Sequence, residues 1–174
     1  MVGYALKWGQ PAWVTVDGKV VEERFAKGAF LSSIAGGKVR LCVDHCWDDI
    51  VARQDDGSLH LVEDSVGLRI TATANHTDAG DVAMEAVRTR YRAGLSVSFN
   101  RPLVEWQNGE DGRVRMITSA RLLEVSVCRN PAYRSREIHA GKMRIERFTA
   151  SLPDPRLERL EAAEAAMAKY RSAP

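Results

Sequence analysis

Short runs of β-forming residues, most of them flanked by turn signals, recur from residue 13 to residue 128, and they constrain the fold more than any other feature. The runs cover residues 13–16, 19–22, 39–43, 59–62, 67–73, 95–104 and 122–128. Between the first two lies Asp17-Gly18, a dipeptide that favours a tight hairpin turn. The sequence therefore predicts a mainly β domain that opens with a hairpin.

Two segments in this region have helical patterns instead. Residues 27–35 predict a short helix that Gly36 and Gly37 end. In residues 78–92 the apolar side chains recur at three-to-four spacing, with three arginines near the C-terminal end, where the helix dipole favours cations. We expect that second helix to end at Gly94, directly before a strand.

The composition changes after about Thr149, which divides the chain into two expected parts. Pro153 and Pro155 interrupt it, and residues 156–171 are rich in Ala, Glu, Leu and Arg. Apolar residues in that stretch are spaced for one helical face: Leu157, Leu160, Ala163 and Met167. The sequence predicts a domain over residues 1–149 and a helical tail over residues 150–174, either packed on the domain or free to bind a partner.

Length and charge limit the classes of function. The chain has 174 residues, 45% of them hydrophobic, which is enough for one substantial core. Its 25 basic and 23 acidic side chains give a net charge of +2, too balanced to indicate a nucleic-acid or membrane surface. No secretory signal and no apolar run of about 18 residues is visible, so we expect an intracellular protein without a membrane span.

Three residues of different chemical types suggest nucleophilic catalysis. Ser96 lies in the apolar run 94–99, His45 follows the run 39–43, and Glu124 lies within the run 122–128. A serine hydroxyl needs a base to take its proton, and that base is usually a histidine oriented by a third group. Spacing along the chain does not bring the three together, and a serine in an apolar strand is most often structural.

Glu124 has two readings that the pattern alone leaves open. Strand alternation places Glu124, Ser126 and Cys128 on one face and the neighbouring apolar residues on the other. The carboxylate is then either on the solvated face of an edge strand or paired within a cleft.

His45 also has an alternative explanation as a metal ligand. Cys42, His45 and Cys46 are possible ligands within five residues, with Asp48 and Asp49 nearby. Structural zinc sites usually need two such ligand pairs, and here only the lone Cys128 remains to form a second one. We therefore expect no metal and no cofactor, and reduced cysteines.

The order of five motifs resembles the prohead proteases of tailed bacteriophages, which are head-maturation serine peptidases related in fold to the herpesvirus assemblins. The motifs are Glu23-Arg-Phe-Ala-Lys-Gly-Ala-Phe30, Val43-Asp-His45, Glu63-Asp-Ser-Val-Gly-Leu68, Gly94-Leu-Ser-Val-Ser-Phe99 and Leu123-Glu-Val-Ser-Val-Cys-Arg-Asn-Pro-Ala132. They span about residues 20–138. The resemblance implies a closed or nearly closed antiparallel β-barrel with peripheral helices.

The resemblance also implies the roles of the site residues. Ser96 would be the nucleophile, His45 the general base and Glu124 the third member of the triad. The chain has Ser98 where the family usually has glycine, so Ser98 is a rival hydroxyl. Backbone amides or a nearby cation must form the oxyanion hole, and Arg129 and Asn130 are candidates for it.

A protease of this kind would cut the scaffolding protein, or a scaffold-like part of the major capsid protein precursor, and finally itself. It would act inside the immature capsid, in the cytoplasm of the host cell, either alone or as a homodimer. The tail would dock on scaffold through its apolar face. The alternative is a catalytically inactive assembly protein with the same fold, which Ser98 in place of glycine favours.

Overall fold

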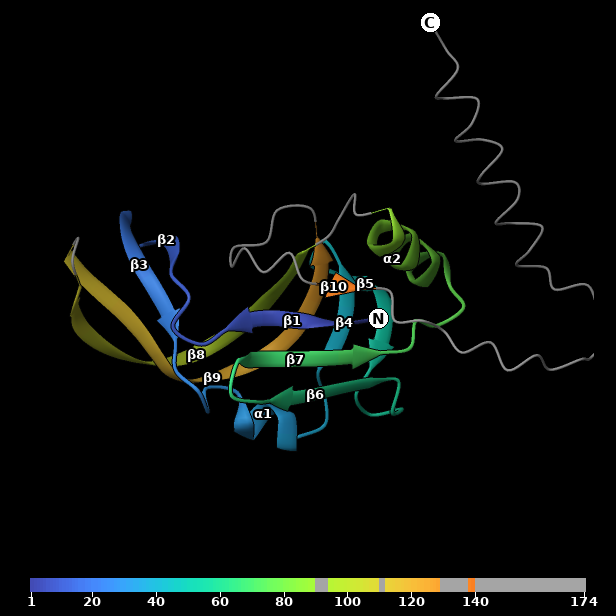
Figure 1. Ribbon diagram of the computed structural model, residues 1–174, viewed down its shortest axis with the longest axis horizontal. Coiled ribbons are helices and arrows are strands. Elements are labelled where there is room, and N and C mark those ends of the chain that lie inside the picture. Colours follow the sequence, from blue (N-terminus) through green and yellow to red (C-terminus); the bar gives the residue numbers. More distant parts are fainter. Residues whose placement is uncertain (90–93, 110–111, 129–137, 140–174) are drawn as a thin grey trace, which may run out of the picture. The chain divides into compact units, whose positions relative to one another are not determined.

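The computed structural model describes residues 1–89, 94–109, 112–128 and 138–139 (Figure 1). All of them belong to the unit Met1–Lys142, and the expected tail over residues 150–174 lies outside the described residues.

The first of two sheets is antiparallel throughout. Its strand order is β10 (Ile138–His139), β1 (Val2–Lys7), β7 (Gly67–Ala72) and β6 (Leu59–Glu63). β6 and β7 form a hairpin whose turn Asp64 stabilises: one oxygen of its carboxylate accepts the amide protons of Val66 and Gly67. The runs at residues 59–62 and 67–73 predicted this hairpin, whereas β1 was not predicted.

The second sheet contains six strands and branches at its longest member. It consists of β2 (Ala12–Val16), β3 (Lys19–Phe25), β4 (Arg40–Val43), β5 (Cys46–Arg53), β8 (Gly94–Gly109) and β9 (Gly112–Cys128). β8 pairs with β9 from end to end and occupies one edge of it. On the other edge, β9 pairs first with β3 and then with β4, both in parallel. The C-terminal half of β9 is therefore an internal strand between β4 and β8.

The expected antiparallel barrel is wrong, although the mainly β character is confirmed. Closing a barrel requires the last strand of a sheet to pair with its first. Here one branch ends at β2 and the other at β5, and no ladder joins the two sheets in the described part of the chain. The β3 and β4 ladders on β9 are also parallel.

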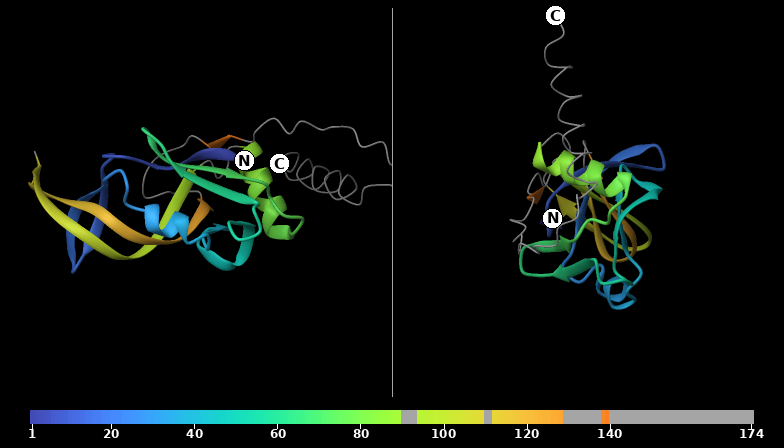
Figure 2. Two further views of the ribbon diagram at one scale, coloured as in Figure 1. Left: turned by 90° about the horizontal axis from the view of Figure 1, so that it is seen from below. Right: turned by 90° about the vertical axis from the view of Figure 1, so that its right-hand side faces the viewer.

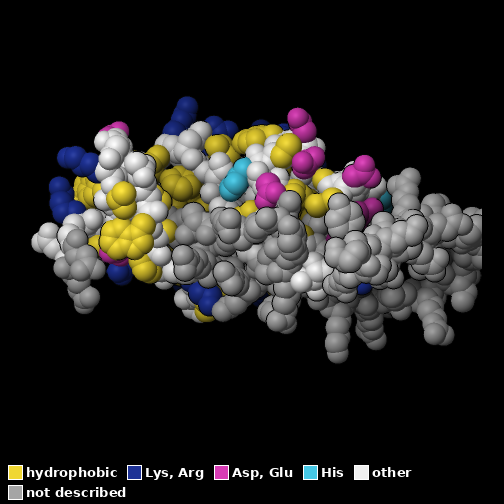
Figure 3. All heavy atoms as spheres, turned by 90° about the horizontal axis from the view of Figure 1, so that it is seen from above, with side chains coloured by type: hydrophobic (Ala, Val, Ile, Leu, Met, Phe, Trp, Pro, Cys, Tyr) yellow, Lys and Arg dark blue, Asp and Glu magenta, His cyan; other side chains and the backbone are white. Residues whose placement is uncertain are grey.

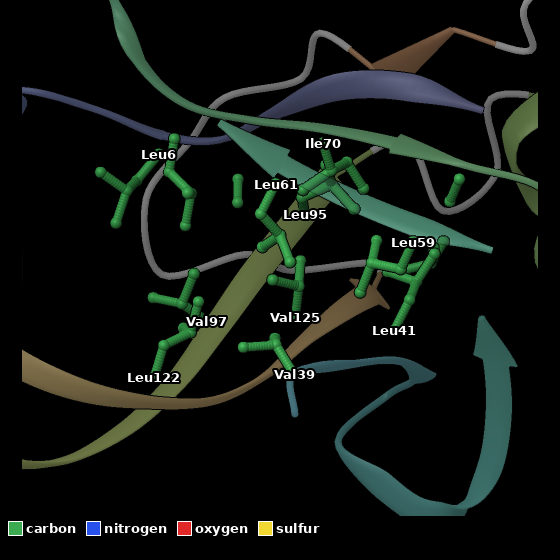
Figure 4. Close-up of a cluster of buried hydrophobic side chains, with 14 of the residues drawn as sticks. Leu6, Val39, Leu41, Leu59, Leu61, Ile70, Leu95, Val97, Leu122 and Val125 are labelled. Carbon is green, nitrogen blue, oxygen red and sulfur yellow. The ribbon is translucent and has the colours of Figure 1, made fainter. Parts of the chain in front are cut away.

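Side-chain packing, not edge pairing, holds the two sheets together. In the close-up of Figure 4, Leu6, Leu61 and Ile70 of the first sheet meet Leu95 and Val125 of the second. All five side chains are buried. Burying one such side chain contributes roughly 1.5–3 kcal/mol, so this layer favours the association of the two sheets.

The two helices of the described chain flank the sheets (Figures 1 and 2). α1 (Leu31–Ala35) is shorter than the expected helix 27–35, because residues 27–30 form turns. α2 (Asp78–Arg88) is capped at its N-terminus by Thr77, whose side chain accepts the Gly80 amide proton at 3.3 Å, and it packs against β4 and β5. The predicted second helix is confirmed to Arg88, and residues 90–92 lie outside the described chain.

The end of the second sheet that β2 and β3 form carries exposed apolar residues. Trp13, Val20, Leu103 and Trp106 are among them, and the Arg113 guanidinium lies 5.0 Å from the centroid of the Trp106 ring. Figure 3 shows hydrophobic side chains beside Lys and Arg at the end that β2 and β3 form. The hairpin predicted from Asp17-Gly18 is confirmed there, with φ angles of 49° and 74° at the two turn residues.

Candidate active site

The candidate site begins with a hairpin loop of two residues, Asp44 and His45, between β4 and β5. Both residues have left-handed backbone angles, with φ of 47° and 62°. Such angles fit the tight hairpin turn, and Asp and His adopt them more often than most residues, though at a cost of roughly 1–2 kcal/mol each. The Asp44 amide donates to the Val127 carbonyl at 3.1 Å, which holds the loop against β9.

The loop places the imidazole of His45 on the carboxylate of Glu124. Nδ1 of His45 lies 2.5 Å from Oε1 of Glu124. The carboxylate is fully buried, whereas 43% of the His45 side chain is exposed. A buried charge is stable only when it is hydrogen-bonded, and His45 supplies one such bond. Of the two readings of Glu124, the structure therefore supports the paired one, because β9 is internal at this point.

Ser126 joins the backbone of the loop to the same carboxylate. The His45 amide donates to Oγ of Ser126 at 2.9 Å, and that hydroxyl donates to Oε2 of Glu124 at 2.6 Å. Both oxygens of Glu124 are thus hydrogen-bonded. Sequence reasoning gave Ser126 no role, and the available signal was the strand alternation that placed it on the face of Glu124.

Both serines of β8 lie opposite this network. Ser96 pairs in register with Ser126, and Ser98 pairs with Glu124. Residues directly opposite each other in an antiparallel pair share a face, about 4.5–5.5 Å apart at Cβ. Leu95 and Val97, which alternate with the serines along β8, point into the core in Figure 4, so the serines point to the other face of the sheet.

The structure therefore brings Ser96, His45 and Glu124 into one region, although they lie far apart in the sequence. Ser96 is 4% exposed, and no hydrogen bond joins its hydroxyl to His45 among the described residues. Free enzymes often show long or absent catalytic hydrogen bonds that form only when substrate binds. Ser98 is less buried and occupies the same face, so the rivalry between the two hydroxyls persists in the fold.

The cysteines expected as alternative metal ligands are all free thiols. Burial, and next the charge of Glu124, raise the pKa of the Cys42 thiol to about 11, so it is protonated near neutral pH. Within the described residues, no group of three or more Cys, His, Asp or Glu side chains is placed to hold a metal ion.

Two further expectations concern the oxyanion hole and membrane-spanning helices. Arg129 and Asn130, the candidates for the oxyanion hole, lie outside the described residues. Neither helix in the described ranges has the length and apolar character that crossing a bilayer requires.

Comparison with known proteins identifies the family. The family model described as caudovirus prohead serine protease matches residues 1–151, which includes every residue of the site described above. Searches of curated proteins and of solved structures gave no match. Because the family match covers most of the 174 residues, the chain belongs to the caudovirus prohead serine protease family.

Proposed function

We propose that this chain is a serine endopeptidase of phage head maturation in which Ser96 is the nucleophile, His45 the general base and Glu124 the orienting acid. The observation that carries the proposal is the 2.5 Å contact between Nδ1 of His45 and the buried carboxylate of Glu124, one strand away from Ser96. Membership of a serine protease family supports it.

The contact defines how the imidazole is used. A carboxylate accepts hydrogen bonds, so the neutral ring carries its proton on Nδ1 and leaves Nε2 free as a base. Nε2 takes the proton of Ser96 as Oγ attacks the carbonyl carbon of the peptide bond. The buried charge of Glu124 then stabilises the imidazolium that forms.

Collapse of the tetrahedral intermediate completes the first half of the reaction. His45 returns the proton to the leaving amine, the C–N bond breaks, and Ser96 holds the acyl group as an ester. A water molecule, deprotonated by the same imidazole, then hydrolyses the ester. As the ester C–O bond breaks, the imidazolium returns this proton to Oγ of Ser96, so the ring takes up and releases a proton twice in each cycle and the free serine is regenerated.

The substrates are proposed from the resemblance to prohead proteases and not from the geometry of the site. The proposed targets are the scaffolding protein, or a scaffold-like part of the major capsid protein precursor, and the protease itself, inside the immature capsid. The predicted tail over residues 150–174 is the proposed contact with scaffold, and homodimerisation is one proposed route to activation.

A catalytically inactive assembly protein with the same fold is the second candidate. Ser98 beside Ser96, together with the 4% exposure of Ser96 and the absence of a hydrogen bond from it to His45 in the described chain, favours that candidate. It predicts a folded protein whose serines do not react with reagents that need an activated hydroxyl.

A fluorophosphonate probe distinguishes the two candidates, because it reacts with activated serines. We expect the wild-type chain to be labelled within residues 93–101, with fragment-ion mass spectra placing the label on Ser96. Ser96→Ala and His45→Ala should abolish labelling while their thermal transitions remain cooperative.

Ser98→Ala is the matched control, because it removes a hydroxyl two residues away on the same face of β8. It should retain labelling of Ser96. A label on Ser98 would assign the nucleophile to that residue instead. A folded wild-type chain that is not labelled would favour the inactive assembly protein.

A further inference from the structure

We propose that Ser126 is a positioning residue that fixes both His45 and Glu124 for the reaction. The inference rests on the proposed function, because it assigns Ser126 a part in the same site. Ser126 is fully buried, and its hydroxyl contacts the other two residues at once, His45 through its amide and Glu124 through Oε2.

The direction of each hydrogen bond follows from the chemistry of the groups. A backbone amide only donates, so Oγ of Ser126 must accept from the His45 amide at 2.9 Å. The single hydrogen of the hydroxyl is then available for Oε2 of Glu124 at 2.6 Å. Oε2 therefore acts as an acceptor, and Oε1 remains for the imidazole.

This arrangement restricts two motions that would move the base. The Glu124 side chain rotates about several bonds, and the bond to Oε2 fixes the orientation of its carboxylate. The His45 backbone has a strained left-handed angle, φ 62°, and the bond from its amide stabilises that loop conformation. Without the hydroxyl, the buried Glu124 carboxylate and the His45 amide each lose a hydrogen bond, so both the carboxylate that holds the imidazole and the backbone that carries it are less restrained.

Ser126 also stands in a position that relates the base to the nucleophile. It pairs in register with Ser96 on β8 and with Cys42 on β4, the strand that leads into the His45 loop. The residue that holds the loop thus lies directly opposite the proposed nucleophile. A misplacement of about 1 Å in such a site reduces the rate about 100-fold.

The test compares Ser126→Ala and Ser126→Thr with a matched control, Ser33→Ala. Ser33 has the same kind of role at another point of β9: its Oγ accepts the Leu122 amide proton at 2.9 Å and donates to the Ala120 carbonyl at 3.3 Å. Ser33→Ala therefore measures the effect of losing two such bonds away from the site. Thermal unfolding of each variant monitors the fold.

The rate of fluorophosphonate labelling is the first readout. We expect Ser126→Ala to lower it about 10- to 100-fold, with Ser126→Thr restoring most of the rate because it keeps the hydroxyl. Ser33→Ala should remain close to wild type at a similar loss of thermal stability. A wild-type rate in Ser126→Ala, or an equal loss in Ser33→Ala, would overturn the inference.

Proton NMR of the imidazole of His45 separates this inference from the proposed function. The Nδ1 proton in a short bond to a carboxylate gives a downfield signal, which His45→Ala assigns. We expect the signal to be lost or displaced in Ser126→Ala and kept in Ser33→Ala. If the wild-type chain is not labelled, the proposed function fails, while this signal alone still decides whether Ser126 positions the pair.

Discussion

At the residue scale, the buried carboxylate of Glu124 is the group on which the site depends most. Both of its oxygens accept hydrogen bonds, from the His45 imidazole and from the Ser126 hydroxyl. In Glu124→Gln, one of the two oxygens becomes an amide nitrogen that cannot accept. If the nitrogen faces His45, the wrong tautomer of the imidazole is favoured, and if it faces Ser126, the hydroxyl proton loses its acceptor.

We therefore expect Glu124→Gln to lower the labelling rate of Ser96 about 10⁴-fold while the chain still folds. Glu63→Gln is the matched control, because the Glu63 carboxylate also accepts two hydrogen bonds, from the amides of Gly28 and Phe30 at 2.7 Å each. That variant should lose stability without a comparable loss of labelling. Equal labelling losses in both variants would contradict a role for Glu124 in orienting the base.

The thiols give a second prediction at this scale. Cys42 is buried and its raised pKa of about 11 leaves about 0.1% thiolate at pH 8, whereas Cys46 is exposed. Iodoacetamide should alkylate Cys46 in the native protein and reach Cys42 only after unfolding in urea, as peptide mapping would show. Because the unfolded thiol ionises first, stability should also fall as the pH rises from about 8.5 to 11. Rapid alkylation of Cys42 in the native protein would show that its thiol is neither buried nor protonated as described.

The sequence predicted the residue types of the site but not their contacts. A serine, a histidine and a glutamate were recognisable, and the family resemblance selected Ser96, His45 and Glu124 among them. The hydrogen bonds through Ser126 depend on β9 lying between β4 and β8. Such long-range pairing leaves no pattern of its own in a single sequence. The alternation of polar and apolar residues around Glu124 is the same whether the carboxylate is solvated or paired.

At the element scale, the turn into β7 is closely packed against β1. A Cβ added to Gly67 would overlap the Leu6 carbonyl oxygen and lie 2.9 Å from the Cα of Lys7. Gly18, in the turn between β2 and β3, has a φ of 74° and no atom within 4 Å of such a Cβ. Substituting alanine at Gly67 therefore tests the steric overlap with the backbone, whereas substituting it at Gly18 tests the cost of a positive φ.

We expect Gly18→Ala to destabilise the fold by about 1 kcal/mol and Gly67→Ala to cost at least about 2 kcal/mol more. Urea unfolding of both variants measures the difference. Similar losses would mean that β1 and β7 separate easily at this point. Gly67 would then pack less closely against Lys7, its partner on β1, than it does in the structure.

Element predictions succeeded where local signals are strong. Asp17-Gly18 fixed the first hairpin, and the three-to-four spacing from Asp78 predicted α2 as far as Arg88. β1, β5 and the first half of β9 were missed. β5 carries two adjacent aspartates, Asp48 and Asp49, at exposed positions in its first half, so it lacks the alternation by which a strand is recognised.

At the scale of the whole molecule, the sheet branches where a barrel was expected. β3 and β4 pair with the same edge of the 17-residue strand β9, β3 near its beginning and β4 near its end. Local propensity does not determine which strands pair with each other. The mainly β fold class was therefore predictable, whereas the open, branched sheet was not. The branch point has a functional consequence, because it places the His45 loop and the β8 serines on either side of β9.

The proposed proteolysis of head proteins can be followed by intact mass spectrometry of co-expressed proteins. The chain would be expressed with its scaffold or capsid precursor, in parallel with Ser96→Ala and Ser98→Ala. We predict discrete fragments with the wild-type chain and with Ser98→Ala, and none with Ser96→Ala. Unchanged precursor masses in all three samples would contradict the account.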